Sequence, residues 1–143
     1  MEKTFGIKEK YIDYKKRIGV YALIDDGQNV GLIRVDEGFF LVGGGVEAGE
    51  THDACLKREC IEEIGYDIEI IKHICSANVY VYLNDLGYYQ MIQHYYFVKL
   101  KEFIKPAIDK DHHFMMVPYR DIKMKIPMQD WAIHYFLEMK DNI

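Results

Sequence analysis

Three glutamates, Glu59, Glu62 and Glu63, have a spacing that could bind a cation. Positions i, i+3 and i+4 lie on one face of a helix, so their carboxylates would form a patch about 6 Å long along the axis. The patch is unfavourable alone, because like charges repel and the negative end of the helix dipole is near. Mg²⁺ prefers oxygen ligands and would remove this conflict. The spacing therefore indicates a divalent-cation site, with a solvated acidic helix face as the alternative.

The segment that must position these acids runs between two glycine signals. The glycines at 43–45 predict a flexible loop. Thr51 is the expected N-cap of the helix that follows, and Gly65 is its expected left-handed C-cap. Arg58 can pair with Glu62 at i+4 and so offset part of the repulsion between the acids.

Taken together, residues 44–65 resemble the Nudix box, the signature of the Nudix hydrolase family. Val42 stands where many members have proline, and Cys60 and Tyr66 stand where aliphatic residues are usual. None of these departures removes a ligand. The fixed positions of the box are all filled, by Gly44, Glu50, Arg58, Glu59, Glu62, Glu63 and Gly65.

The resemblance implies an α/β (α+β) fold, a mixed β-sheet sandwiched between helices with the box as a loop–helix–loop, in a single domain over residues 1–143. It also implies Mg²⁺-dependent hydrolysis of a nucleoside diphosphate linked to another group, with Mn²⁺ as the alternative cofactor. The run at 17–24 and the terminal Trp131-Ala132 look most like MutT-type members, which convert nucleoside triphosphates, including oxidised ones, to the monophosphate and pyrophosphate. The alternatives are a nucleotide-sensing domain without catalysis and a hydrolase of dinucleoside polyphosphates or nucleotide sugars.

The resemblance also implies the metal ligands. Glu59 and Glu63 correspond to direct ligands, and Glu62 shares the cluster as a ligand or as a partner of Glu59. The backbone carbonyl of Gly44 is a further expected ligand.

Two more box residues are expected to act by positioning, and one role stays open. Arg58 and Glu50 should form a salt bridge that ties the loop to the helix. The general base is expected to be a box glutamate such as Glu63. The alternative is His113. In a subgroup of the family that this chain resembles, a strand near the end of the chain begins Asp-His-Glu, and in the corresponding segment here, 111–116, His113 stands in the place of that glutamate.

The nucleotide contacts are expected outside the box. Aromatic faces stack on bases without sequence preference, although an aromatic content of 14% would also simply fill a β-rich core. The predicted substrate contacts are Arg17, Phe39, Tyr82 and His113.

Composition limits the function classes. The net charge of −5 argues against broad nucleic-acid binding, which needs basic patches. The sequence contains no run of about 18 apolar residues, so it predicts no membrane span. Its N-terminus also lacks the apolar core of a signal peptide. Cys55, Cys60 and Cys75 are odd in number and form no CxxC pair, so we expect reduced, buried thiols in a cytoplasmic protein. The resemblance to the Nudix family implies a small nucleotide as substrate and a protein that is a monomer or a homodimer.

The remaining elements follow from hydrophobic pattern and turn signals. Residues 1–16 should supply an edge strand, and residues 101–111 a mobile loop around Pro106. Pro127 should open a terminal helix in which Trp131 and Phe136 anchor the core. Strands are expected at 17–24, 29–35, 39–42, 68–75, 77–83, 88–100 and 113–117, with one long bent strand in place of those at 68–75 and 77–83 as the alternative.

Overall fold

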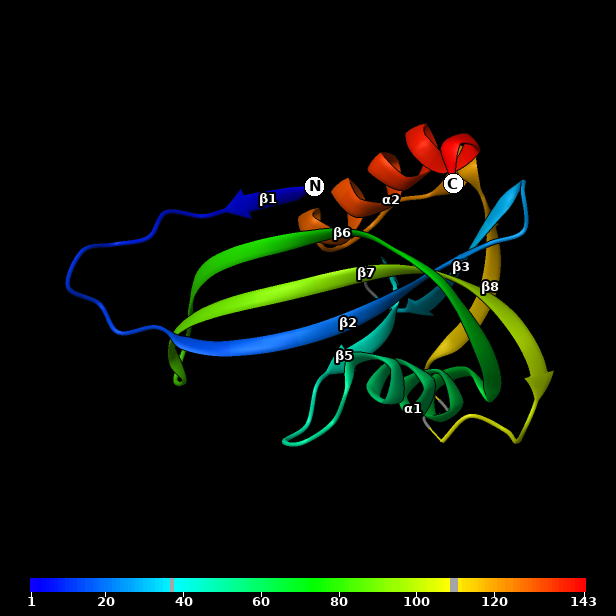
Figure 1. Ribbon diagram of the computed structural model, residues 1–143, viewed down its shortest axis with the longest axis horizontal. Helices are drawn as coiled ribbons and strands as arrows, with labels where there is room; N and C mark the ends of the chain where they lie inside the picture. Colours follow the sequence, from blue (N-terminus) through cyan, green and yellow to red (C-terminus); the bar gives the residue numbers. More distant parts are fainter. Residues whose placement is uncertain (37, 109–110) are drawn as a thin grey trace.

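The computed structural model describes residues 1–36, 38–108 and 111–143, which form one mixed sheet with a helix on each face (Figure 1). The main elements are β1 (Glu2–Phe5), β2 (Lys15–Asp25), β3 (Asn29–Val35), β4 (Gly38–Phe40), β5 (Val42–Gly45), α1 (His52–Ile64), β6 (Tyr66–Leu83), β7 (Gly87–Phe103), β8 (His113–Pro118) and α2 (Pro127–Met139). Two short 3₁₀ helices, Tyr119–Asp121 and Lys140–Asn142, accompany them.

The sheet has the order β1-β6-β7-β2-β3-β4, with β5 added to β2 and β8 added to β3. The pairs β1–β6 and β2–β7 are parallel, and the others are antiparallel. β2 and β3 pair only beside their turn, through Ile24 with Gly31 and Asp25 with Val30. Farther along, β2 pairs with β5 and β3 pairs with β4 and β8, so the two strands separate.

Alternate residues of β2 serve two different cores. Val20 and Ala22 pack with Leu56 of α1, whereas Leu23 packs with Phe136 of α2. Successive strand side chains point to opposite faces, so α1 and α2 cover opposite faces of the sheet, as Figure 1 shows. The predicted sandwich of a mixed sheet between helices is confirmed.

The predicted ends of the central helix are confirmed. The Thr51 hydroxyl oxygen accepts a hydrogen bond of 3.1 Å from the backbone N–H of Ala54. Gly65 adopts the left-handed conformation, with φ 79° and ψ 11°, and closes the helix. Its carbonyl accepts the N–H of Ile104 at 2.7 Å, which joins the helix end to the segment after β7.

The glycine run differs from the prediction of a loop. Residues 43–45 belong to β5, which pairs with β2, and the loop starts at Val46. A Cβ on Gly43 would lie 2.2 Å from the carbonyl oxygen of Val20, and its φ is 151°, so this pairing requires glycine. The single strand expected at 39–42 is likewise two strands, β4 and β5.

Other expectations are confirmed with longer strands. β1 is an edge strand, and the segments at 68–75 and 77–83 form one bent strand, β6, which was the alternative to two strands. β7 continues to Phe103, so the start of the loop expected at 101–111 is strand, and residues 109–110 of that loop lie outside the described residues.

The core anchors also agree with the sequence. Phe136 is buried, and Trp131 is half-buried with its ring 5.9 Å from that of Phe5. Neither α1 nor α2 has the length and apolar character needed to cross a bilayer, nor does any other helix of the described residues. The cysteines are free and buried, as predicted: Cys55, Cys60 and Cys75.

Candidate active site

The three predicted acids line one hollow of about 520 Å³, which we call the acid hollow. Glu59, Glu62 and Glu63 share one face of α1, as their spacing predicts. The full lining of the acid hollow is Gly43, Glu59, Glu62, Glu63, Ile108 and His112. The helix therefore meets β5 and the segments before β8 at this point.

Backbone atoms of β5 hold two of these acids. The Gly43 N–H donates a hydrogen bond of 2.9 Å to Oε1 of Glu63. Gly44 lies against Glu59 so closely that a Cβ there would be 2.6 Å from the Glu59 Oε1. The glycine at this position therefore makes room for a carboxylate.

Arg58 joins the acids to the loop. Its guanidinium donates to both oxygens of Glu50, at 2.8 and 3.0 Å, which forms the predicted salt bridge. The same group donates to Glu59 at 3.0 Å and to Glu62 at 3.3 Å. The bonds to Glu50 lower the pKa of Glu50 to about 2 and raise the pKa of Arg58, so both groups stay charged at neutral pH.

The acid hollow is electrostatically suited to a cation. Burial raises the pKa of Glu59, which Arg58 opposes and Glu62 reinforces. Burial also raises the pKa of Tyr21, and the carboxylates of Glu63 and Glu59 add to that effect. The neighbouring carboxylates therefore add to the effect of burial, and a cation in the hollow would offset their repulsion.

The donor set also fits Mg²⁺. Within the described residues, no group of three or more His, Cys, Asp or Glu side chains is already arranged to hold a metal ion. Mg²⁺ commonly takes only one or two carboxylates and keeps water and substrate phosphates as its other ligands. Glu59 and Glu63, both held against β5, can supply such a pair.

A second hollow, which we call the apolar pocket, adjoins the acid hollow. It lies where β2 and β3 separate and has a volume of about 390 Å³, within the range of small-molecule sites. The two hollows share Gly43, Glu63 and His112. The apolar pocket is lined by Tyr21, Ile33, Val35, Phe40, Leu41, Gly43, Glu63, His112, Ile126 and Gln129.

The histidine at the acids is His112 and not the predicted His113. Nδ1 of His112 lies 3.8 Å from Oε2 of Glu63. His113 begins β8, is exposed and pairs with Arg34. Phe114 packs in the core beneath α1, and because side chains alternate along a strand, His112 shares its face while His113 points away.

Phe39 and Tyr82 also lie away from both hollows. The Phe39 ring packs against the core beneath α2, and its neighbour Phe40 lines the apolar pocket instead. Tyr82 is 57% exposed and contacts Tyr88 beside the β6–β7 turn. A strand places adjacent residues on opposite faces, and the sequence did not show which phenylalanine faces the pocket.

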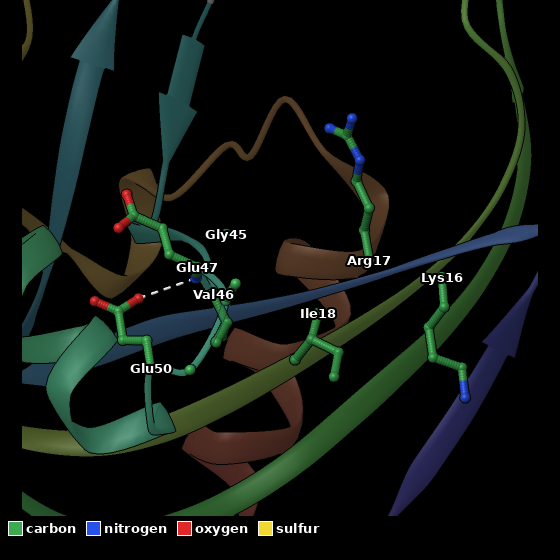
Figure 2. Close-up of a pocket in the computed structure, with 9 residues that line it drawn as sticks. Lys16, Arg17, Ile18, Gly45, Val46, Glu47 and Glu50 are labelled. Carbon is green, nitrogen blue, oxygen red and sulfur yellow. Dashed lines mark hydrogen bonds between the residues drawn. The ribbon is translucent and has the colours of Figure 1, made fainter.

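Arg17 lines a third hollow, which we call the loop-side hollow (Figure 2). Its guanidinium lies 4.7 Å from the centre of the Tyr89 ring. The loop here is closed by a hydrogen bond of 3.0 Å from the Glu47 N–H to the Glu50 carboxylate. The loop-side hollow has a volume of about 580 Å³ and is lined by Lys16, Arg17, Ile18, Gly45, Val46, Glu47, Ala48, Gly49 and Glu50.

A comparison with known protein families matches most of the chain. Residues 14–139 match the family described as NUDIX domain. No curated protein matches the sequence.

Solved structures share the fold at low sequence identity. A NUDIX hydrolase from Nitrosomonas europaea has a TM-score of 0.71 and 16% identity over 88% of this chain and 91% of its own. A MutT NUDIX hydrolase from Burkholderia pseudomallei has a TM-score of 0.68 and 20% identity over 85% of this chain and 98% of its own. An ADP-ribose pyrophosphatase from Streptococcus suis has a TM-score of 0.65 and 15% identity over 87% of this chain and 91% of its own.

Proposed function

The chain belongs to the Nudix family, and on that premise we propose that it hydrolyses a nucleoside triphosphate to the monophosphate and pyrophosphate with Mg²⁺. The observation that carries this proposal is the junction of two hollows. Three carboxylates line the acid hollow, and mostly apolar side chains line the adjoining pocket. A substrate with its base in the pocket would bring its phosphates to the acids. We further propose that a monomer or homodimer acts on small nucleotides in the cytoplasm, with Mn²⁺ as the alternative ion.

Each box residue then has a role. Glu59 and Glu63 would hold the ion, with Glu62 beside them and the Gly44 carbonyl as a further ligand. When bound, the ion stabilises negative charge on the phosphoryl oxygens. Arg58 orients Glu59 and Glu62 through its hydrogen bonds.

Glu63 is the proposed general base. Its Oε1 is oriented by the Gly43 N–H, and its Oε2 faces His112. A carboxylate fixed in this way can accept the proton of an attacking water. Because the exposed His113 lies on the other face of β8, we do not assign it this role.

A substrate screen with Mg²⁺, in which the nucleotide products are separated by chromatography, tests the function. The substrates are nucleoside triphosphates, dinucleoside polyphosphates, nucleotide sugars and ADP-ribose, since the similar Streptococcus suis protein is an ADP-ribose pyrophosphatase. We expect the triphosphates to be cleaved to monophosphates. Glu63→Gln should lower the rate at least about tenfold, the effect of losing about 1.4 kcal/mol of transition-state stabilisation.

Glu69→Gln is the matched control, because Glu69 is an exposed glutamate of β6 outside the site. Equal turnover in wild type and Glu63→Gln would contradict the proposed roles of Glu63 in catalysis. Turnover of ADP-ribose, a nucleotide sugar or a dinucleoside polyphosphate in place of the triphosphates would change the substrate class. Tight nucleotide binding without turnover would identify a sensor.

A further inference from the structure

Three histidines, which we call the histidine cluster, meet beside the first turn of α1 and line none of the hollows described above. His52 begins α1, His73 lies in β6 and His94 lies in β7. Nε2 of His73 lies 3.0 Å from Nδ1 of His94. The ring centre of His94 lies 4.7 Å from that of His52, whose Nδ1 is hydrogen-bonded at 2.8 Å to the Tyr96 hydroxyl.

The pairing of β6 with β7 brings His73 and His94 together. His73 lies opposite Tyr96, and the register of the two strands shifts immediately after His73. His94 precedes Tyr96 by two residues, so its side chain is on the same face of the sheet. The two histidines are therefore diagonal neighbours, a relation in which large ring side chains can reach each other.

The distance between the two nitrogens is one that a single metal ion can span. Two imidazole nitrogens bound to one ion at about 2.0–2.1 Å, with an angle of about 90–110° between them, lie roughly 2.9–3.4 Å apart. The separation of 3.0 Å between His73 and His94 is within this range. His73 is exposed and His94 is half-buried, so an ion and its bound water can reach the pair.

The protonation of the two rings also suits a metal ion. Burial lowers the pKa of His73 below 6.5 and the pKa of His94 to about 4, and the charge of His52 adds to both effects. Both rings are therefore neutral at pH 7, and neutral imidazole is the form that binds metals. Imidazole nitrogen suits Cu²⁺, Ni²⁺ and Zn²⁺, whereas Mg²⁺ and Mn²⁺ favour oxygen ligands.

We propose that His73 and His94 form a metal site, separate from the acid hollow, that binds a divalent late transition-metal ion through Nε2 of His73 and Nδ1 of His94. Within the described residues, no group of three or more His, Cys, Asp or Glu side chains is arranged to hold a metal ion, so water would complete the coordination of this pair. His52 packs against the His94 ring and limits its movement. The inference does not depend on the proposed hydrolysis.

Titration of the full chain with CuCl₂, NiCl₂, ZnCl₂ and MnCl₂, followed by calorimetry, tests the site. Excess Mg²⁺ is present throughout to occupy the acid hollow. We expect one Cu²⁺ to bind per chain, Ni²⁺ and Zn²⁺ to bind more weakly, and Mn²⁺ to bind most weakly, in the order that nitrogen ligands impose. The electron paramagnetic resonance spectrum of the Cu²⁺ complex should show splitting by two nitrogens.

Two variants locate the ion. His73→Gln and His94→Gln each leave one of the two imidazoles, so the Kd of Cu²⁺ should rise at least about tenfold and the splitting should change to that of one nitrogen. His134→Gln is the matched control, because His134 is an exposed histidine of α2 outside the cluster and should bind Cu²⁺ as the wild type does. Melting curves without metal establish that each variant is folded. Ni²⁺ at ten times its Kd should raise the Tm of the wild type by about 3–6 °C.

The outcomes separate this inference from the proposed function. No Cu²⁺ binding by the wild-type protein overturns the site, whether or not the variants fold. An unchanged Kd and unchanged nitrogen splitting in both folded variants would place the ion elsewhere and also overturn it. If no triphosphate is hydrolysed but Cu²⁺ is bound through two nitrogens that the variants remove, the histidine site stands and the proposed hydrolysis fails.

Discussion

The acid hollow and the loop-side hollow have similar volumes, about 520 and 580 Å³, but hold their charged groups differently. In the acid hollow, Glu59 and Glu63 are packed or hydrogen-bonded against β5. In the loop-side hollow, Lys16 and Arg17 are exposed and point away from each other (Figure 2). Fixed, converging groups can bind an ion or a phosphate without first being ordered, whereas exposed side chains lose conformational entropy when they bind. The volume of a hollow therefore does not indicate whether its charged groups are arranged to bind an ion or a phosphate.

Arg58 connects the two hollows, and its removal should have the largest effect. Arg58→Ala leaves Glu50, Glu59 and Glu62 without their shared donor. Charge-assisted hydrogen bonds contribute about 1.5–3 kcal/mol each, so loss of about 2 kcal/mol of positioning should lower kcat/KM about thirtyfold. Lys57→Ala, which removes an exposed cation from the same helix, should change it little. Equal loss in both variants would point to a general charge effect.

Gly44 tests the fixed geometry of the acid hollow alone. The new Cβ in Gly44→Ala would lie 2.6 Å from the Glu59 carboxylate and displace it. We expect activity to fall about tenfold, because small shifts of a catalytic group are costly. Gly45→Ala is the control, since a Cβ on Gly45 meets nothing within 4 Å. Unchanged turnover in Gly44→Ala would show that the Glu59 position is unimportant.

Substitution of Arg17 tests whether the loop-side hollow contributes to substrate binding. An exposed charge contributes about 0.2–1 kcal/mol, so Arg17→Ala should raise KM by a factor between about 1.4 and 5 while kcat stays constant. Lys16→Ala should leave KM unchanged, because its side chain points the other way (Figure 2). A fall in kcat as large as that expected for Arg58→Ala would reverse the comparison between the hollows.

The other end of α1 provides a reference outside both hollows. Nδ1 of His94 lies 3.0 Å from Nε2 of His73, and the His94 ring centre is 4.7 Å from that of His52. Burial, followed by the charges of His52 and His73, lowers the pKa of His94 from 6.5 to about 4. The unfolded chain then binds more protons than the folded one in this window, so stability should decrease as pH falls from 6.5 towards 4.

Melting temperatures between pH 7 and pH 4 check this prediction. His94→Gln should flatten the decrease, and His134→Gln, at an exposed position, should not. The relative activity of His94→Gln at pH 7.5 should match that of the wild type. A pH profile of stability identical in His94→Gln and wild type would contradict the lowered pKa.

The parts of the fold that local sequence determines were predictable. Thr51 and Gly65 mark the ends of α1 because capping depends on neighbouring residues. The helical period alone brings Glu59, Glu62 and Glu63 together. The strand assignment of the glycines at 43–45 depends on close pairing with β2, and that contact is not visible in the segment itself.

The differences between the predicted site residues and the residues that line the hollows have a common cause. One residue of strand register separates His113 from His112 and Phe39 from Phe40, and the pattern does not fix that register. The sequence did not indicate that Gln129 lines the apolar pocket. Its position there depends on the hydrogen bond from the Leu41 N–H to its Oε1, and Leu41 lies in a different part of the chain. Long-range contacts therefore decide the part of the site that is proposed to bind the substrate.

Anomalous diffraction from a crystal grown with Mn²⁺ and a non-hydrolysable nucleoside triphosphate tests the central claim most directly. We expect the manganese peak in the acid hollow, coordinated by Glu59 and Glu63 and by phosphate oxygens, with the base in the apolar pocket. A peak in the loop-side hollow, with the acids of α1 facing solvent, would contradict it.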